Sequence, residues 1–480
     1  MTGTGTPTAE PLTAEPAAAE APTAFGRLVR HHRTRIGLTQ RELSDFSTIS
    51  VRAIRDLEQG RAKRPRHDTV RLIADGLRLG PKAREALESA AWQDRVGWPL
   101  KADFDAEPPG APAAPDALIG REPQIRALTA ELSAGPERLT HIVGLTGVGK
   151  TRLALEVAAR VHAEAGFPVL WSAPQDAPVE YTLSDAAENL APVVRACVTG
   201  LFSPGAAERE GTAALVRLVG DQPALLVLDG AGDRAPRAEG VARLLRDCPR
   251  LRLLATSPAP FGLPRERVFL LEPLAVPQPS DEHDARALEQ VPSAALLLGR
   301  IRRVRPGFVP EPGDLAAVAR ICRLLDGLPL ALRAAASWLL VYDLATLHAC
   351  LADGPGPLLR HLAGPDEDCP LPGALALAPL RLSAPVRDLL AALCERGGEF
   401  GLADVMALTG ADVSDCGRMV RELLLLGATR TCHAGGQARF RVLNLVRAAL
   451  AGPGATAARL PRELPQADSG RVSHGWRERV

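Results

Sequence analysis

The sequence predicts a multidomain protein with an all-α domain at its N-terminus, an α/β domain with a parallel sheet in the middle, and mostly helical modules after it. Helical periodicity runs from about Ala24 to Ala91. Strand-like and helical segments then alternate from about Arg138 to Leu271, which is typical of a parallel sheet covered by helices. From about Asp281 onward the pattern is mostly helical. A chain of 480 residues has room for about three domains.

The net charge of +1 hides an uneven distribution of charged residues. Residues 25–94 carry 15 Lys and Arg against 9 Asp and Glu, a local net charge of +6, so the rest of the chain is mildly acidic. A basic N-terminal domain joined to a mildly acidic remainder of the chain indicates that the N-terminal domain binds a polyanion. The 8 cysteines include no C-x-x-C pair, which argues against a zinc or dithiol site and favours free thiols in a reducing cytosol.

Three segments are expected to lie outside the folded domains. Residues 1–22 are rich in Thr, Ala, Pro and Glu, lack the features of a signal peptide, and are predicted to form a disordered leader. Residues 95–116 are predicted to be a linker and residues 451–480 a disordered tail. No apolar run approaches the ~18 residues that a membrane-spanning helix needs. We therefore expect a cytoplasmic, nucleoid-associated protein with no membrane contact.

The segment from Leu38 to Arg61 predicts two short helices joined by a tight turn. Thr39 and Glu42 form a capping box that starts the first helix at Gln40. A turn is expected at residues 47–49, and Ser50 can cap the second helix. The second helix has a narrow apolar seam made by Val51, Ile54 and Leu57.

This segment, with the basic loop and helix that follow it, resembles the lambda-repressor-like (XRE-type) helix-turn-helix family over about residues 23–94. One departure is Thr48, which stands where the family usually has a turn glycine. The resemblance implies that the helix after Ser50 enters the major groove of double-stranded DNA, with Arg52 on guanine and Ala53 on a thymine methyl. The expected DNA-binding residues are Thr39, Gln40, Ser50, Arg52, Ala53, Arg55, Asp56, Arg61, Lys63, Arg64 and Arg66. Two alternatives stay open: a helical bundle with a solvated arginine surface, and a helix-turn-helix domain that binds protein.

A phosphate-binding loop follows the predicted strand His141–Val143. Residues 144–151 fit the pattern G-x-x-x-x-G-K-S/T, placed after a strand and before a helix, which is the context of a P-loop. Backbone N–H groups would surround phosphates, Lys150 would reach the β- and γ-phosphates, and Thr151 would bind Mg²⁺. The expected nucleotide-binding residues here are Gly144, Thr146, Gly147, Val148, Gly149, Lys150, Thr151 and Arg152.

A second candidate metal ligand is Asp229, which ends the apolar run Ala224–Leu228. A buried strand that delivers this carboxylate to the Mg²⁺ is the Walker B interpretation. The alternative is a core strand that simply ends at a turn before Gly230.

Together these motifs resemble the NB-ARC/STAND family of switch ATPases, in particular actinobacterial regulators. The likeness depends on Ile119–Glu122, the P-loop, the strand ending at Asp229, Ala255–Ser257 and Leu325–Leu332 in that order. It implies a P-loop nucleotide-binding domain (117–277), a helical domain (278–365) and a winged-helix-like domain (366–450), with ATP or ADP and Mg²⁺ as cofactors. It also implies that Ile119 and Arg121 lie near the adenine and that Pro329 packs at the nucleotide.

Three departures from the NB-ARC/STAND pattern predict slow or no hydrolysis. Gly230 replaces the second acidic residue after Asp229, and Pro258 replaces a sensor arginine. Val442, Leu443 and Asn444 stand where the family often has Met-His-Asp. Losing a cation that faces the transition state slows phosphoryl transfer by orders of magnitude but leaves ground-state binding largely intact. The one candidate for the missing acid is Asp233.

We therefore expect a DNA-binding transcription regulator gated by ATP or ADP, at most a slow ATPase, with the potential to form a homo-oligomer on DNA. The alternative is a STAND-type signalling ATPase whose N-terminal domain recruits a protein partner. A third interpretation is a constitutive repressor with a vestigial nucleotide domain.

Overall fold

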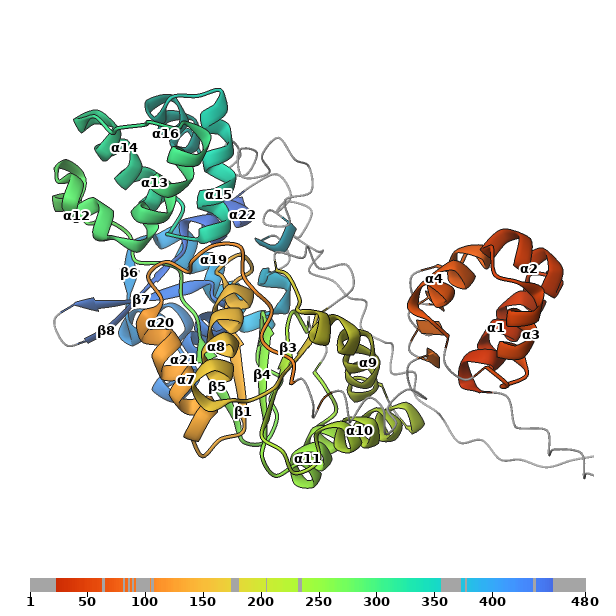
Figure 1. Cartoon of the computed structure of the whole chain (residues 1–480). Coiled ribbons are helices and arrows are strands. Elements are labelled where there is room, and N and C mark those ends of the chain that lie inside the picture. The colour runs from red at the N-terminus through yellow and green to blue at the C-terminus, as the bar shows by residue number, and fades with distance from the viewer. Residues whose placement is uncertain are drawn as a thin grey trace, which may run out of the picture.

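The computed structural model describes residues 23–62, 65–80, 83–84, 87–88, 90–91, 104, 108–173, 181–203, 205–231, 235–354, 373–375, 378–434 and 437–451. Figure 1 shows helices α1–α4 grouped together at one side and an α/β body with two further helical groups at the other. The described part contains no helix long and apolar enough to cross a bilayer. The predicted leader 1–22 and all but the first residue of the predicted tail 451–480 lie outside the described residues, and Ala451 is the last residue of α22.

The N-terminal domain is a bundle of short helices around an apolar core. Its helices are α1 (Ala24–Arg35), α2 (Gln40–Ser47), α3 (Val51–Glu58) and α4 (His67–Gly76). The core side chains are almost fully buried, among them Phe25, Val29, Leu43, Ile54 and Ile73. The predicted apolar seam of α3 is confirmed, since Ile54 and Leu57 are buried and Val51 is half-buried.

Local capping fixes where α2 and α3 begin. The capping box is present: the Glu42 backbone N–H donates to Thr39 Oγ1 (3.2 Å), and the Thr39 N–H donates to the Glu42 carboxylate (2.7 Å). Ser50 accepts from the Ala53 N–H at 3.2 Å and caps α3. Thr48 has φ 57°, in the left-handed region that a glycine adopts without strain. The turn predicted at residues 47–49 is therefore confirmed, with a β-branched residue at its strained position.

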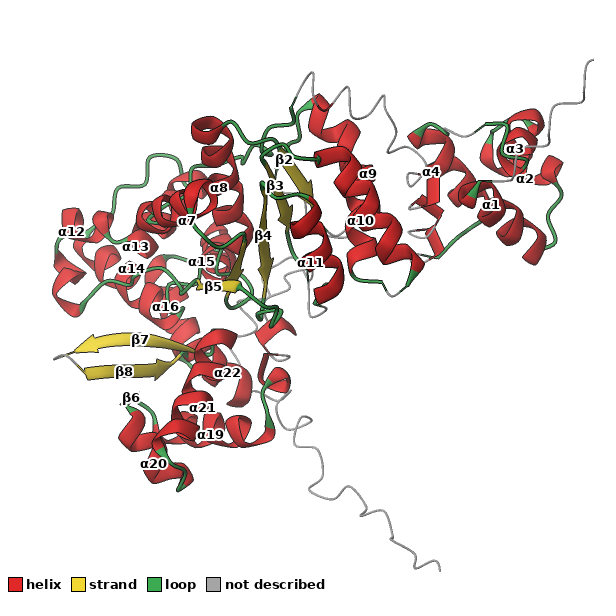
Figure 2. Ribbon diagram, turned by 90° about the horizontal axis from the view of Figure 1, so that it is seen from below, coloured by secondary structure: helices red, strands yellow, loops and turns green. Residues whose placement is uncertain are grey.

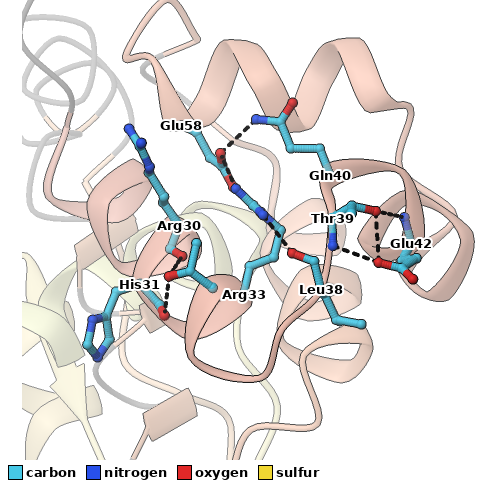
Figure 3. A network of polar contacts seen from close by, with 9 residues as sticks. Arg30, His31, Arg33, Leu38, Thr39, Gln40, Glu42 and Glu58 are labelled. Atoms are coloured by element: carbon cyan, nitrogen blue, oxygen red, sulfur yellow. Dashed lines mark hydrogen bonds and ion pairs between the residues drawn. The ribbon is translucent and has the colours of Figure 1, made fainter.

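A buried polar network joins α1, α2 and α3 (Figure 3). Arg33 donates to both oxygens of Glu58, from Nε at 2.7 Å and from Nη2 at 3.0 Å, and its Nη1 donates to the Leu38 carbonyl at 2.7 Å. The amide nitrogen of Gln40 donates to Glu58 at 2.7 Å. One carboxylate thus holds the two helices of the helix-turn-helix pair and the helix before them.

The body has a five-stranded parallel sheet in the order β2-β3-β4-β1-β5. The strands are β1 (Leu139–Val143), β2 (Val169–Ser172), β3 (Ala224–Leu228), β4 (Leu251–Ser257) and β5 (Glu266–Leu270). Figure 2 shows α7 (Glu122–Ala134) and α8 (Lys150–Ala165) on one face, and α9 (Asp185–Leu201), α10 (Ala206–Val219) and α11 (Ala238–Asp247) on the other. Because both faces are covered, β1 and β3 are buried along their whole length, as their apolar sequences predict.

A helical group follows the sheet in the chain. It consists of η1 (Pro279–His283), α12 (Ala285–Gln290), α13 (Pro292–Val304), α14 (Pro312–Leu324), α15 (Pro329–Ser337), η2 (Trp338–Leu340) and α16 (Leu344–Ala352). Proline stands at the first turn of α13, α14 and α15, where its missing N–H breaks no helical hydrogen bond.

The last group is mostly helical, as predicted, and also contains a small antiparallel sheet in the order β6-β8-β7. Its elements are η3 (Ala378–Arg381), α19 (Ala384–Arg396), β6 (Glu399–Phe400), α20 (Leu402–Thr409), α21 (Val413–Leu426), β7 (Thr429–Ala434), β8 (Gln437–Val442) and α22 (Asn444–Ala451). The winged-helix interpretation of residues 366–450 stays a prediction.

Candidate functional site

The loop between β1 and α8 has a backbone that only glycine permits. Gly144, Gly147 and Gly149 have φ of 151°, 84° and 101°. A Cβ on Gly144 would lie 2.5 Å from the Leu271 carbonyl oxygen, and one on Gly147 would lie 2.7 Å from the Cβ of Leu330. The loop therefore turns tightly into the N-terminus of α8, where backbone N–H groups and the helix dipole favour an anion.

Lys150 lies at the start of α8 and folds back over this loop. Its Nζ donates to the Gly144 and Leu145 carbonyls at 2.9 and 3.1 Å. Burial lowers the pKa of Lys150 to about 8, Asp229 acts in the opposite direction, and Arg381 lowers the pKa further. A buried cation beside a turn of this kind is suited to bind phosphate oxygens.

Thr151 and Asp229 come together from α8 and the end of β3. The Thr151 hydroxyl donates to Asp229 Oδ1 at 2.8 Å, and the Thr256 hydroxyl donates to the same oxygen at 2.7 Å. Burial raises the pKa of Asp229, against the effect of these hydrogen bonds and of Lys150. A hydroxyl and a carboxylate are oxygen ligands of the kind that Mg²⁺ takes alongside phosphates and water, so the pair fits that ion.

Residues from distant segments surround the loop. The buried Arg121 donates to the carbonyls of Glu272 (2.8 Å) and Val148 (3.4 Å), and burial lowers its pKa to about 10. Leu330, next to Pro329 at the start of α15, donates its N–H to the Gly147 carbonyl at 3.2 Å. A Cβ on Gly427, after α21, would lie 2.7 Å from the Leu145 nitrogen. The loop is thus contacted by every part of the body.

The remaining predicted nucleotide residues are placed less centrally. Arg152 donates to the carbonyl of Asp116. Val148 belongs to the loop, and its side chain is buried. Ile119 and Thr146 are half-buried. Asp233, the candidate substitute acid, lies outside the described residues.

Two of the three departures from the NB-ARC/STAND pattern, at Gly230 and at residues 442–444, lie in settings that the structure describes. Gly230 has φ 63°, which suits glycine rather than an acidic side chain, and its N–H donates to Thr256 Oγ1 at 2.9 Å. Val442 and Leu443 are buried in the C-terminal group. Asn444 starts α22 and donates its side-chain amide to the Arg323 carbonyl at 3.0 Å, so it links two helical groups.

Asp326 makes a second link between the same groups, which sequence reasoning missed. It lies in the turn between α14 and α15 at φ 53° and is buried. Its Oδ2 accepts from the Leu445 N–H at the start of α22 at 3.0 Å. Burial raises the pKa of Asp326 to about 7, although α22 backbone N–H groups, Arg430 and Arg447 all act to lower it.

Replacing Asp326 by asparagine is expected to remove a pH dependence of stability. A carboxyl whose pKa is higher in the folded protein binds its proton more tightly there, so its stabilising effect is complete below about pH 4 and is lost as the pH rises to about 7. The melting temperature of Asp326→Asn, relative to wild type, should therefore be more favourable at pH 8 than at pH 5. Asp353→Asn, an exposed change after α16, is the control. An identical difference at both pH values would contradict this assignment.

The candidate DNA-binding residues cluster on and around α3. Arg52 is 92% exposed, and its Nε lies 3.9 Å from Asp56, which also lies 3.8 Å from Arg61. Ser50, Arg55 and Arg66 are exposed, and Ala53 is half-buried. Gln40 is turned toward Glu58, and Thr39 is engaged in its cap. Lys63 and Arg64 lie outside the described residues.

Comparison with known proteins places a helix-turn-helix domain at residues 24–87. Over 332 residues the chain is 30% identical to "Putative HTH-type transcriptional regulator Rv0890c" of Mycobacterium tuberculosis, covering 67% of this chain and 34% of that one. The chain thus spans about a third of the length of that regulator. It is also 30% identical over 348 residues to "Uncharacterized protein Rv0894" of Mycobacterium tuberculosis, covering 69% of this chain and 79% of the relative.

Among solved structures, one protein from Pyrococcus horikoshii is a signal transduction ATPase with numerous domains (STAND) that has a tetratricopeptide repeat sensor. The alignment with it covers 71% of this chain and 43% of that protein's chain. The sequence identity is 14% and the TM-score 0.28, which is too slight a likeness to support a conclusion.

Proposed function

Because this chain belongs to the same family as the Mycobacterium tuberculosis protein "Uncharacterized protein Rv0894" and has a helix-turn-helix domain at residues 24–87, we propose that it is a DNA-binding transcription regulator gated by ATP or ADP. The likeness to that relative and to the longer "Putative HTH-type transcriptional regulator Rv0890c" extends far beyond residues 24–87, so the body is shared too.

The observation that supports DNA binding most directly is the exposed surface of α3. A capped helix on a rigid domain presents Arg52 and Arg55 to solvent, and the domain has a net positive charge. Such a helix fits the major groove, where arginine pairs with guanine O6 and N7, while the exposed Arg61 and Arg66 are placed to contact phosphates.

Nucleotide binding is proposed from the contacts of the loop at residues 144–151. The glycine backbone, the buried Lys150 and the Thr151–Asp229 pair form a cradle for a triphosphate or diphosphate with Mg²⁺. We propose slow or no hydrolysis, since Gly230 cannot supply an acid at its position, and neither Pro258 nor the buried Leu443 supplies a cation from its own position.

The domain boundaries belong to the same proposal. They are a helix-turn-helix domain at 23–94, a P-loop domain at 117–277, a helical domain of NB-ARC type at 278–365 and a winged-helix-like domain at 366–450. Gating would act through the contacts that the last two make with the loop, at Leu330 and Gly427. A change in the packing of these domains biases the presentation or pairing of the N-terminal domains on DNA.

The test is binding of the purified full-length chain to genomic DNA fragments, with and without ATP or ADP, over a series of salt concentrations. Arg52→Ala is expected to weaken binding to a selected fragment by about ten- to one-hundred-fold and to change random DNA little. Arg71→Ala, an exposed arginine on α4, is the matched control and should bind as wild type does.

Two outcomes would overturn parts of the proposal. Wild-type protein that binds no fragment at low salt would favour a STAND-type signalling ATPase that recruits a protein partner. An equal loss on selected and random DNA with Arg52→Ala would remove the base-reading role of Arg52.

A further inference from the structure

A cavity of about 360 Å³ lies between the β4–β5 loop and the C-terminal helices, beside the phosphate-binding loop. Pro260 lines one side, and Arg381 from η3, Arg418 and Arg421 from α21 line the other. Glu422 is the carboxylate among the lining residues, and both of its oxygens accept from Ser383, from N–H at 2.7 Å and from the hydroxyl at 3.1 Å. Arg418 also pairs with Asp415, one turn earlier on α21, so three guanidinium groups are set against two carboxylates and the balance still favours an anion.

The cavity is adjacent to the phosphate end of the proposed nucleotide site. Leu426 lines it, and the next residue, Gly427, packs on Leu145 of the loop so closely that a Cβ would lie 2.7 Å from the Leu145 nitrogen. Arg381 is near enough to Lys150 to lower its pKa. Arg381 comes from η3 and Lys150 from the start of α8, so an anion bound between them would be stabilised by both.

The opposite wall is held rigidly. The Glu266 carboxylate accepts from the N–H groups of Phe261 and Leu263, both at 2.9 Å, and pairs with the buried His141. Burial raises the pKa of Glu266, but these hydrogen bonds bring it below its ordinary value. The Ser257 hydroxyl donates to the Ala259 carbonyl, so His141 Nε2 donates to Ser257 at 2.8 Å. The loop that carries Pro260 is thus fixed at both ends.

We propose that Arg381 contacts the terminal phosphate of a nucleoside triphosphate held by the phosphate-binding loop, and so makes the site prefer ATP to ADP. This deepens the proposed function and rests on it. A diphosphate ends at Lys150 and leaves the cavity to water, whereas a triphosphate extends toward the cavity and joins the C-terminal group to the P-loop domain. Arg381 thus couples the presence of the γ-phosphate to the contact between the C-terminal group and the P-loop domain.

The experiment measures the dissociation constants of ATP and ADP, with Mg²⁺, for the full-length wild type and for Arg381→Ala, Arg381→Lys and Arg396→Ala. Arg396 lies at the far end of α19, where it pairs with Asp404 at 2.7 Å, and its substitution removes the same charge away from the cavity. We expect Arg381→Ala to weaken ATP about tenfold or more and ADP less than twofold, because one charged phosphate contact is lost. Arg381→Lys should recover part of the ATP affinity, and Arg396→Ala should match wild type.

Each other outcome is decisive. Equal ATP and ADP affinities in the wild type, or an equal effect of Arg381→Ala on both, would overturn the role of Arg381 while leaving nucleotide binding in place. Wild type that binds neither nucleotide would overturn the proposed function itself. Melting temperatures of the variants, measured in parallel, identify any variant that fails to fold, in which case Arg381→Lys alone decides between preference and no preference for ATP.

Discussion

Replacing Glu58 by alanine is expected to unfold the N-terminal domain and abolish DNA binding. The Glu58 side chain is 4% exposed and receives hydrogen bonds from Arg33 and Gln40. Its removal leaves the guanidinium of Arg33, itself 10% exposed, as a buried cation without its counter-charge. Breaking a buried pair in this way costs about 3–5 kcal/mol, a large part of the stability of a small domain near the lower end of the range of about 5–15 kcal/mol.

Hydrogen exchange of the full-length chain measures this effect directly. Amides in α1–α3 should lose protection in Glu58→Ala, while amides in β1 and β3 keep theirs. Glu42→Ala is the matched control, because it removes an exposed carboxylate that only completes a helix cap. Unchanged protection of α1–α3 in Glu58→Ala would show that the network stabilises little.

Replacing Lys150 by alanine is expected to lower ATP and ADP affinity at least about a hundredfold. The ammonium group is held at the mouth of the loop by the Gly144 and Leu145 carbonyls, where it would contact two phosphates, and each hydrogen bond to a charged group contributes about 1.5–3 kcal/mol. Any effect of nucleotide on DNA affinity should disappear with it, while DNA binding without nucleotide persists.

Calorimetric titration of the full-length chain checks the nucleotide affinity, and Arg160→Ala, on the exposed side of α8, is the control. If Lys150→Ala bound nucleotide and DNA as wild type does, the nucleotide domain would be vestigial and the protein a constitutive regulator.

Local features were predictable from sequence because a few neighbouring residues determine them. The start of α2 follows from Thr39 and Glu42, and the start of α3 from Ser50, through hydrogen bonds that span three residues. The strand–loop–helix at 139–165 follows from an apolar run, a glycine pattern and helical periodicity. α2 and α3 begin where the sequence indicates, whereas β1 begins at Leu139, two residues before the predicted strand His141–Val143.

Features that depend on contacts between distant segments were not predictable. Asp326 reads as an ordinary turn residue until α22 is placed against it, and Arg381 lies in a segment without any motif. Pro258 itself carries no guanidinium. A single sequence cannot show that Arg381, from η3, lines the same cavity as Ala259 and Pro260. The prediction that Gln40 binds DNA likewise did not anticipate its hydrogen bond to Glu58, 18 residues away.

The close packing of Gly427 on Leu145 also has a consequence for synthesis on the ribosome. Roughly 280 residues separate the two positions, which at about 5–20 residues per second corresponds to about 15 to 60 seconds of translation. The strands β2 to β5 are synthesised within that interval, while Gly427, which closes one side of the loop, comes at its end. We therefore expect the side of the loop that Gly427 covers to stay open until the C-terminal helices have been synthesised.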